Sequence, residues 1–144
     1  MRAAASNSSA TFLSVTAAEI FSPWVGDSER AVVELFRKAR MGAPTVLFID
    51  EIDSLVAARG GDRQKAADRV LSALLTEMDG VGGGREGRGR VFVVGATNRP
   101  DSLDPAITRP GRLDSLLYVP PPDRDGRRDI LEALLRKVVF NFGI

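Results

Sequence analysis

The seven residues from Thr45 to Glu51 read TVLFIDE, and they decide the expected fold. Five consecutive apolar or β-branched residues, Thr45 to Ile49, are typical of a strand that is buried on both faces of a parallel sheet. This strand runs directly into two acids, Asp50 and Glu51. Ligands of open parallel sheets bind outside the carboxyl ends of the strands. The stretch therefore predicts a buried strand that ends at a ligand-binding edge.

Strand-like and helix-like segments alternate on both sides of this stretch. Further strands are expected at residues 12–15, 91–94 and 116–119. Amphipathic helices are expected from a cap at Asp27 or Ser28 to Gly42, from about Arg63 to Met78, and from a cap at Asp123 or Asp125 to Val138. The alternation predicts an α/β sandwich with a mainly parallel sheet. No repeat or linker divides residues 1–144, so a single domain is expected.

The composition excludes several classes of function. The 20 Lys and Arg residues nearly balance the 19 Asp and Glu residues, so no strong field draws the chain onto nucleic acid. The chain has no Cys and no His, which leaves carboxylates, Lys and Tyr as candidate bases. No apolar run approaches the roughly 20 residues that a membrane-spanning helix needs. Without Cys or a membrane segment, an intracellular soluble protein is expected, in the cytoplasm or the nucleus.

Polar residues follow two of the expected strands: Asp50 and Glu51 after the first, Thr97 and Asn98 after the second. We expect them along one edge of the sheet. An apolar strand ending in Asp-Glu has the form of a Walker B element, in which Asp50 would hold Mg²⁺ through water. Glu51 would then polarise a water that attacks the terminal phosphate. Taken alone, the pattern fits a strand with two solvated acids equally well.

Six ordered motifs strengthen the nucleotide interpretation. They are WVGDSE (24–29), APTVLFIDEIDS (43–54), EMDG (77–80), GATNRPD (95–101), DPA (104–106) and RPGRLD (109–114). Together they resemble the AAA ATPase family of the AAA+ superfamily, over about residues 11–137. The second ATPase domain of valosin-containing-protein-like and spermatogenesis-associated members is the most similar. The resemblance implies a P-loop NTPase with a three-layer sandwich that binds ATP and Mg²⁺.

The resemblance also implies a role for each matching residue. Asp50 and Glu51 match the Walker B pair, and Asn98 matches the first sensor, which positions the attacking water. Arg109 and Arg112 match arginine fingers, which act on nucleotide held by a neighbouring subunit. In other phosphoryl-transfer systems such a finger contributes about 10³–10⁵ in rate. Considered alone, the two arginines are better explained as a solvated loop pair or as ordinary carboxylate bridges, and the motif context favours the finger role.

Trp24 is the only Trp in the chain, and it stands beside Val25 in an expected loop. The resemblance makes Trp24 and Val25 the pore loop that grips a substrate polypeptide in the channel of a ring. An amphipathic ring offers a large contact area to many sequences. The alternative is a Trp that packs on the surface of its own domain.

A Gly/Arg loop occupies residues 82–90. Its three arginines, Arg85, Arg88 and Arg90, have no interleaved aromatic residue for stacking on bases. A surface connection therefore explains the loop better than nucleic-acid binding does.

The sequence departs from the family pattern in two places. No G-x-x-x-x-G-K-[ST] motif is present, so Walker A and the first central strand are missing. Residues 138–144 do not resemble the start of the expected lid domain. By the family's strand order, the missing strand would lie between residues 91–94 and 116–119. We therefore expect a partial core that is inactive alone and prone to unfold or aggregate.

The functional interpretation is an ATP hydrolase module that remodels or unfolds protein substrates in an oligomeric ring, as a homo- or hetero-hexamer working with adaptors. The first alternative is a non-catalytic assembly or regulatory subunit that supplies arginine fingers to a neighbour. The second is a nucleic-acid binder that uses the Gly/Arg loop. The substitution Glu51→Gln distinguishes the ATP hydrolase from the non-catalytic subunit, because it blocks turnover only in a subunit that hydrolyses ATP itself.

Overall fold

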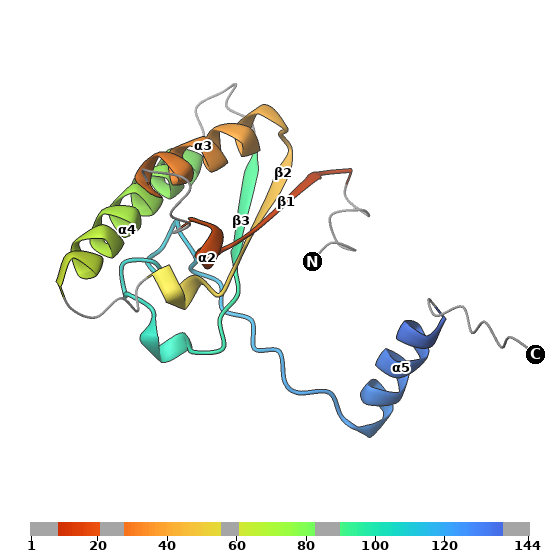
Figure 1. The fold of residues 1–144 in the computed structure, drawn as a ribbon. Helices are drawn as coiled ribbons and strands as arrows, with labels where there is room; N and C mark the ends of the chain where they lie inside the picture. The colour runs from red at the N-terminus through yellow and green to blue at the C-terminus, as the bar shows by residue number, and fades with distance from the viewer. Residues whose placement is uncertain (1–8, 21–27, 56–60, 83–89, 137–144) are drawn as a thin grey trace, which may run out of the picture.

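The computed structural model of the chain describes residues 9–20, 28–55, 61–82 and 90–136. Strands and helices alternate along most of this length (Figure 1). In chain order they are β1 (Thr11–Thr16), α2 (Ala17–Ile20), α3 (Ser28–Met41), β2 (Thr45–Asp50), the 3₁₀ turn η1 (Ile52–Leu55), α4 (Gly61–Gly82), β3 (Val91–Gly95), the 3₁₀ turn η2 (Pro100–Ser102) and α5 (Arg124–Leu135). Each predicted strand before residue 100 is confirmed, within one or two residues at each end.

The three strands form one parallel sheet in the order β1-β2-β3. The register places Phe12, Val46 and Phe92 side by side across the sheet. At the other end of the strands, Ile49 lies opposite Gly95. All three strands therefore end at the same edge of the sheet, as the sequence predicts.

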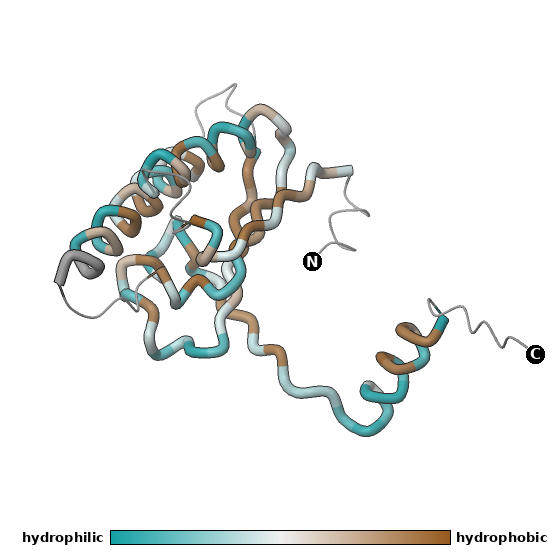
Figure 2. The backbone as a smooth tube through the Cα atoms, viewed as in Figure 1, coloured by the Kyte–Doolittle hydropathy of each residue, from teal (hydrophilic) through white to brown (hydrophobic). Residues whose placement is uncertain are grey.

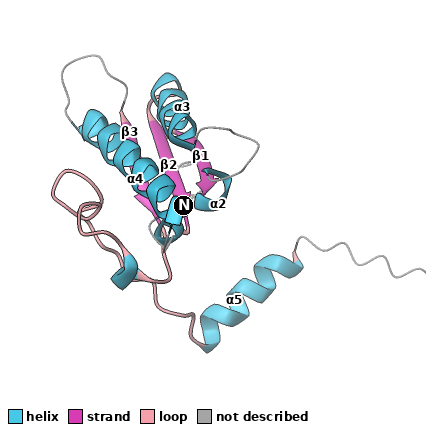
Figure 3. Cartoon of the chain, turned by 60° about the vertical axis from the view of Figure 1, so that its left-hand side comes forward, coloured by secondary structure: helices cyan, strands magenta, loops and turns pink. Residues whose placement is uncertain are grey.

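Helices α3 and α4 lie against each other on one face of this sheet (Figures 1 and 3). Each buries one apolar stripe, with Val32, Phe36 and Ala39 on α3 and Ala67, Val70, Leu74 and Met78 on α4. The Arg40 Nη1 atom on α3 lies 2.7 Å from Glu77 Oε2 on α4, at the rim of their contact. The stripes follow the helical period of the sequence, so burial of these faces holds the two helices on the sheet.

Burial along β2 alternates, which corrects the prediction of a strand buried on both faces. Thr45, Leu47 and Ile49 are fully buried under the helices, whereas Val46 and Phe48 are half-buried. On that second face Phe48 stacks on Phe12, with ring centroids 6.3 Å apart. In Figure 2 the hydrophobic residues of the strands are coloured brown. Both described long helices that pack on the sheet cover the same face, so the described residues form two layers of the expected sandwich.

The expected strand at residues 116–119 is wrong for this structure. These residues are extended without strand pairing, and Leu116, Leu117, Tyr118 and Val119 are each more than three-quarters exposed. They lead away from the sheet to α5, which stands apart (Figure 1). An apolar run becomes a strand only beside a partner with free backbone groups, and no described strand lies next to it.

Helix α5 begins where the sequence predicts, because the Asp123 side chain accepts a hydrogen bond from the Gly126 N–H at 2.8 Å. Its apolar residues Ile130, Leu131, Leu134 and Leu135 remain at least half exposed. Among the described helices, none combines the length and apolar character that crossing a membrane requires.

Candidate functional site

Asp50 is the last residue of β2, and its carboxylate is exposed at the carboxyl edge of the sheet. Its Oδ1 atom accepts a hydrogen bond from the Glu51 N–H at 3.0 Å. Within the described residues, Oδ2 has no such partner. An exposed carboxylate oxygen is the kind of ligand that Mg²⁺ contacts directly or through its bound waters.

Glu51 has an unusual backbone conformation for a residue with a side chain. Its φ angle is 53°, in the left-handed region that costs about 1–2 kcal/mol for most residues. The Ser54 N–H and hydroxyl both donate to the Glu51 carbonyl oxygen, at 2.9 and 2.7 Å, and hold this turn. The turn leads the chain from β2 into η1 and leaves the Glu51 side chain exposed at the sheet edge. Strained backbone of this kind concentrates at functional sites.

The segment after β3 lies beside this turn. The Ala96 N–H donates to the Ile49 carbonyl oxygen at 2.9 Å, and the Ile52 N–H donates to the Ala96 carbonyl oxygen at 3.0 Å. These two bonds extend the β2–β3 pairing past the end of both strands. Asn98 follows two residues later with an exposed side chain. The structure thus brings the segment of Asn98 next to the Asp50-Glu51 turn, as predicted.

Asp53 and Thr97 tie the two segments together by their side chains. The Thr97 hydroxyl donates to Asp53 Oδ1 at 2.8 Å and accepts from the Arg99 N–H at 2.9 Å. Thr97 therefore links the η1 turn to the backbone on the far side of Asn98. Sequence reasoning placed Thr97 at the edge but gave Asp53 no role, because no local pattern signals a contact across 44 residues.

Gly95 allows a third segment to approach the edge. A Cβ atom at this position would lie 2.9 Å from Leu113 Cδ1 and 3.1 Å from Ile52 Cδ1. A lone Gly at the end of a strand is a known signal of such a close approach, and it was the available clue to this contact. Leu113 belongs to the loop that carries Arg109 and Arg112, so this loop lies against the end of β3 at Gly95, near Ile52 of the η1 turn.

Arg109 and Arg112 have different surroundings within this loop. Arg109 is exposed, and its guanidinium has no hydrogen-bond or ion-pair partner in the described part of the chain. Arg112 is largely buried, and it pairs with Asp79 at the end of α4 through two bonds of 2.7 and 2.8 Å. The bonded guanidinium lowers the pKa of Asp79 below its ordinary value and raises that of Arg112. Sequence reasoning assigned no role to Asp79.

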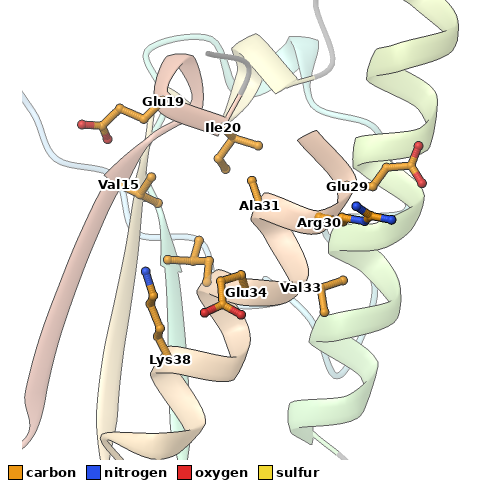
Figure 4. Close-up of a pocket in the computed structure, with 10 residues that line it drawn as sticks. Val15, Glu19, Ile20, Glu29, Arg30, Ala31, Val33, Glu34 and Lys38 are labelled. Carbon is orange, nitrogen blue, oxygen red and sulfur yellow. The ribbon is translucent and has the colours of Figure 1, made fainter. Parts of the chain in front are cut away.

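A cavity of about 830 Å³ opens between the end of β1, α2 and α3 (Figure 4). It is lined by apolar side chains such as Val15 and Ile20 together with charged ones such as Glu34 and Lys38. Asp50, Glu51 and Asn98 are not among its lining residues, so it is separate from the polar edge. The predicted pore-loop residues, Trp24 and Val25, lie outside the described residues.

The described residues contain no cluster of three or more acidic side chains that would hold a metal ion by themselves. Mg²⁺ in phosphate-transferring proteins is held by one or two carboxylates together with waters and substrate phosphates. The exposed carboxylate of Asp50 therefore fits a Mg²⁺ that arrives with a nucleotide.

These features define an α/β protein of the P-loop NTPase type, with acidic and amide side chains at the carboxyl edge of a parallel sheet. A family model confirms and narrows this class. The model described as "ATPase family associated with various cellular activities (AAA)" matches residues 1–121. The chain therefore belongs to the AAA ATPase family, and the predicted family and fold are confirmed.

Proposed function

We propose that this chain is the core of a nucleotide-hydrolysing AAA module that works between neighbouring subunits of a ring and remodels protein substrates. The observation that carries the proposal is the proximity of three elements at one end of the sheet: the Asp50-Glu51 turn, the segment of Asn98, and the arginine loop, whose Leu113 lies against Gly95 at the end of β3. The family match supports the ATPase part of this proposal.

Each side chain at this edge has a task in such a reaction. Asp50 would hold Mg²⁺, which when bound neutralises charge on the phosphates. Glu51 would accept a hydrogen bond from the attacking water and draw its proton toward the carboxylate. Asn98 would orient the same water through its amide. These roles need exposed side chains on a fixed backbone, and the hydrogen bonds around Glu51 and Thr97 fix that backbone.

The arginine loop would serve a different subunit. Arg109 is exposed and without a partner in the described structure, so its guanidinium can reach a phosphate on a neighbouring molecule. A planar guanidinium matches the oxygens of a phosphoryl group in transfer. A hexameric ring with Trp24 and Val25 in its channel remains the assembly that the family resemblance predicts.

The exposed Arg109 also favours a second function. A subunit that does not hydrolyse ATP would still supply Arg109 to a neighbour that does. This alternative fits a sequence in which no Gly-Lys-Ser or Gly-Lys-Thr motif occurs. It requires only the loop of Arg109 and the contacts that hold this loop in place. The turnover of the assembly is then independent of Glu51.

The test uses the native polypeptide, isolated from cells through an antibody against residues 123–136, which are almost all exposed. Its mass and its ATP turnover are measured for the wild type and for Glu51→Gln. The proposal predicts turnover that Glu51→Gln reduces by at least about 10²-fold. Glu34→Gln on α3, outside the antibody's epitope, is the matched control and leaves turnover unchanged. Turnover that survives Glu51→Gln supports the non-catalytic alternative, and no turnover with any variant contradicts the ATPase proposal.

A further inference from the structure

The guanidinium of Arg112 is fully engaged inside its own chain. Its Nε and Nη2 atoms donate to the two carboxylate oxygens of Asp79, at 2.7 and 2.8 Å. Its Nη1 atom donates to the Ala106 carbonyl oxygen at 2.6 Å. The Arg112 side chain is 16% exposed. A bidentate pair with a carboxylate is among the strongest side-chain interactions, so Arg112 is held in place.

These contacts close the loop that carries both arginines. Asp79 lies at the end of α4, and the Ala106 carbonyl lies near the start of the loop. Within the loop, the Leu113 N–H donates to the Ile107 carbonyl oxygen and the Arg112 N–H to that of Arg109, both at 3.1 Å. Ile107 is fully buried in the core. The loop is therefore anchored at Ile107, Arg112 and Leu113, and Arg109 lies between these anchors in the sequence.

We propose that the two arginines have separate roles: Asp79 and Arg112 form a latch that fixes the loop, and Arg109 alone contacts the nucleotide of a neighbouring subunit. This inference rests on the proposed function and refines it. Arg112 and Asp79 are positioning residues, because they act through the placement of Arg109. If Arg112 had to reach a neighbour, it would lose all three internal bonds and leave Asp79 without its partner.

The latch itself is tested on the 144-residue chain by hydrogen exchange at the amides of Ile107, Arg112 and Leu113. Asp79→Asn and Arg112→Gln are each expected to speed exchange at these amides. The double variant is expected to exchange no faster than Arg112→Gln, which already removes all three bonds of the guanidinium. Arg109→Gln leaves exchange unchanged. The matched control is Glu34→Gln, which breaks an exposed bidentate pair with Arg37 on α3. Additive effects of the two latch substitutions would overturn the latch.

The division of roles is tested by ATP turnover of the native polypeptide. Arg109→Lys is expected to lower turnover by about 10³-fold or more with loop exchange unchanged. Asp79→Asn and Arg112→Gln are each expected to lower it by about 10-fold to 100-fold. The exchanged pair Asp79→Arg with Arg112→Glu is expected to turn over at least about threefold faster than Arg112→Gln. It stays below wild type, because a carboxylate at position 112 cannot donate to the Ala106 carbonyl oxygen. Only a positioning role permits that rescue, because position 112 then carries a negative charge.

Asp79→Asn alone keeps the test decisive if the exchanged pair does not fold. If Arg112 were itself the finger, release from Asp79 would leave turnover unchanged or raise it, and this outcome would overturn the proposal. If no form of the polypeptide shows turnover, the proposed function and the role of Arg109 both fail. Turnover that survives Glu51→Gln but falls in Arg109→Lys overturns only hydrolysis by this chain, and the role of Arg109 stands. Hydrogen exchange in the chain still decides whether Arg112 and Asp79 form the latch.

Discussion

The hydroxyl of Thr97 donates to Asp53 Oδ1 over 2.8 Å and joins the two segments that carry Glu51 and Asn98. Both partners are partly buried. Hydrogen bonds to charged groups are stronger than those between neutral groups, and a carboxylate that loses such a donor is costly to keep away from water. This contact therefore couples the position of the expected water-orienting amide to the turn of the expected base.

Removal of the Thr97 hydroxyl is the first prediction. Thr97→Val keeps the shape of the side chain but leaves Asp53 Oδ1 without its donor. We expect a loss of about 1–2 kcal/mol in the free energy of unfolding, measured by urea denaturation of the chain. Thr97→Ser, which retains the hydroxyl, is expected to lose less. A larger loss for Thr97→Ser than for Thr97→Val would show that the methyl group contributes more to stability than the hydrogen bond does.

The left-handed conformation of Glu51 gives a second prediction. In ordinary helix or strand positions, Gly is less stabilising than Ala by about 0.5–1 kcal/mol. At φ 53° this order should reverse, because Gly has no Cβ to clash. We expect the chain with Glu51→Gly to be more stable than that with Glu51→Ala by about 1 kcal/mol in urea denaturation. In the native polypeptide both are expected to abolish turnover, so the strain serves the site rather than the stability. The usual order, with Ala above Gly, would contradict the turn geometry.

Local patterns predicted most of the sheet and both of its packed helices. The apolar run of Thr45–Ile49 and the helical period of Val70, Leu74 and Met78 are signals of burial within one element. The structure buries the three helix residues and every second residue of the run, Thr45, Leu47 and Ile49. The same kind of signal failed at residues 116–119. An apolar run records a preference for burial, but strand formation also needs a partner, and a single element's pattern does not specify one.

The candidate site shows the same division. The strand ends placed Asp50, Glu51 and Asn98 at one edge, because strand direction alone fixes that edge. The pairing of Arg112 with Asp79 spans 33 residues and depends on how α4 ends beside the loop. No spacing in the sequence encodes that contact, so both arginines carried the same expected role until the structure separated them.

The face of the sheet opposite α3 and α4 yields a third prediction. Phe92 lies on that face and is 67% exposed, whereas Leu47 faces the helices and is fully buried. Phe92→Thr keeps a good strand former at an exposed position, so we expect a change within about 0.5 kcal/mol in unfolding free energy. Leu47→Ala is expected to cost about 2–5 kcal/mol. Light scattering should also show less self-association of the Phe92→Thr chain. A large loss of stability from Phe92→Thr would show that this face is packed.

The fourth prediction concerns the acid sensitivity of the chain, and it follows from the pair of Asp79 with Arg112. The hydrogen bond from Arg112 lowers the pKa of Asp79 below its ordinary value of 3.8. A carboxyl with a lowered pKa in the folded state stabilises it above the unfolded pKa, and this contribution is lost as the pH falls through the folded value. Wild-type stability should therefore drop more steeply than that of Asp79→Asn as the pH falls below the ordinary pKa of 3.8, and the two should converge once Asp79 is protonated in the folded state.

Urea denaturation at a series of pH values measures this difference. The pair of Glu34 with Arg37 lowers the pKa of Glu34 in the same direction, but it is present in both chains and cancels from the comparison. Because Asp79 is 57% exposed, added salt should narrow the gap between the two chains at neutral pH. Parallel profiles for wild type and Asp79→Asn would mean that the pair adds no net stability, since a contribution that depends on the ionised carboxylate must vanish once that carboxylate is protonated.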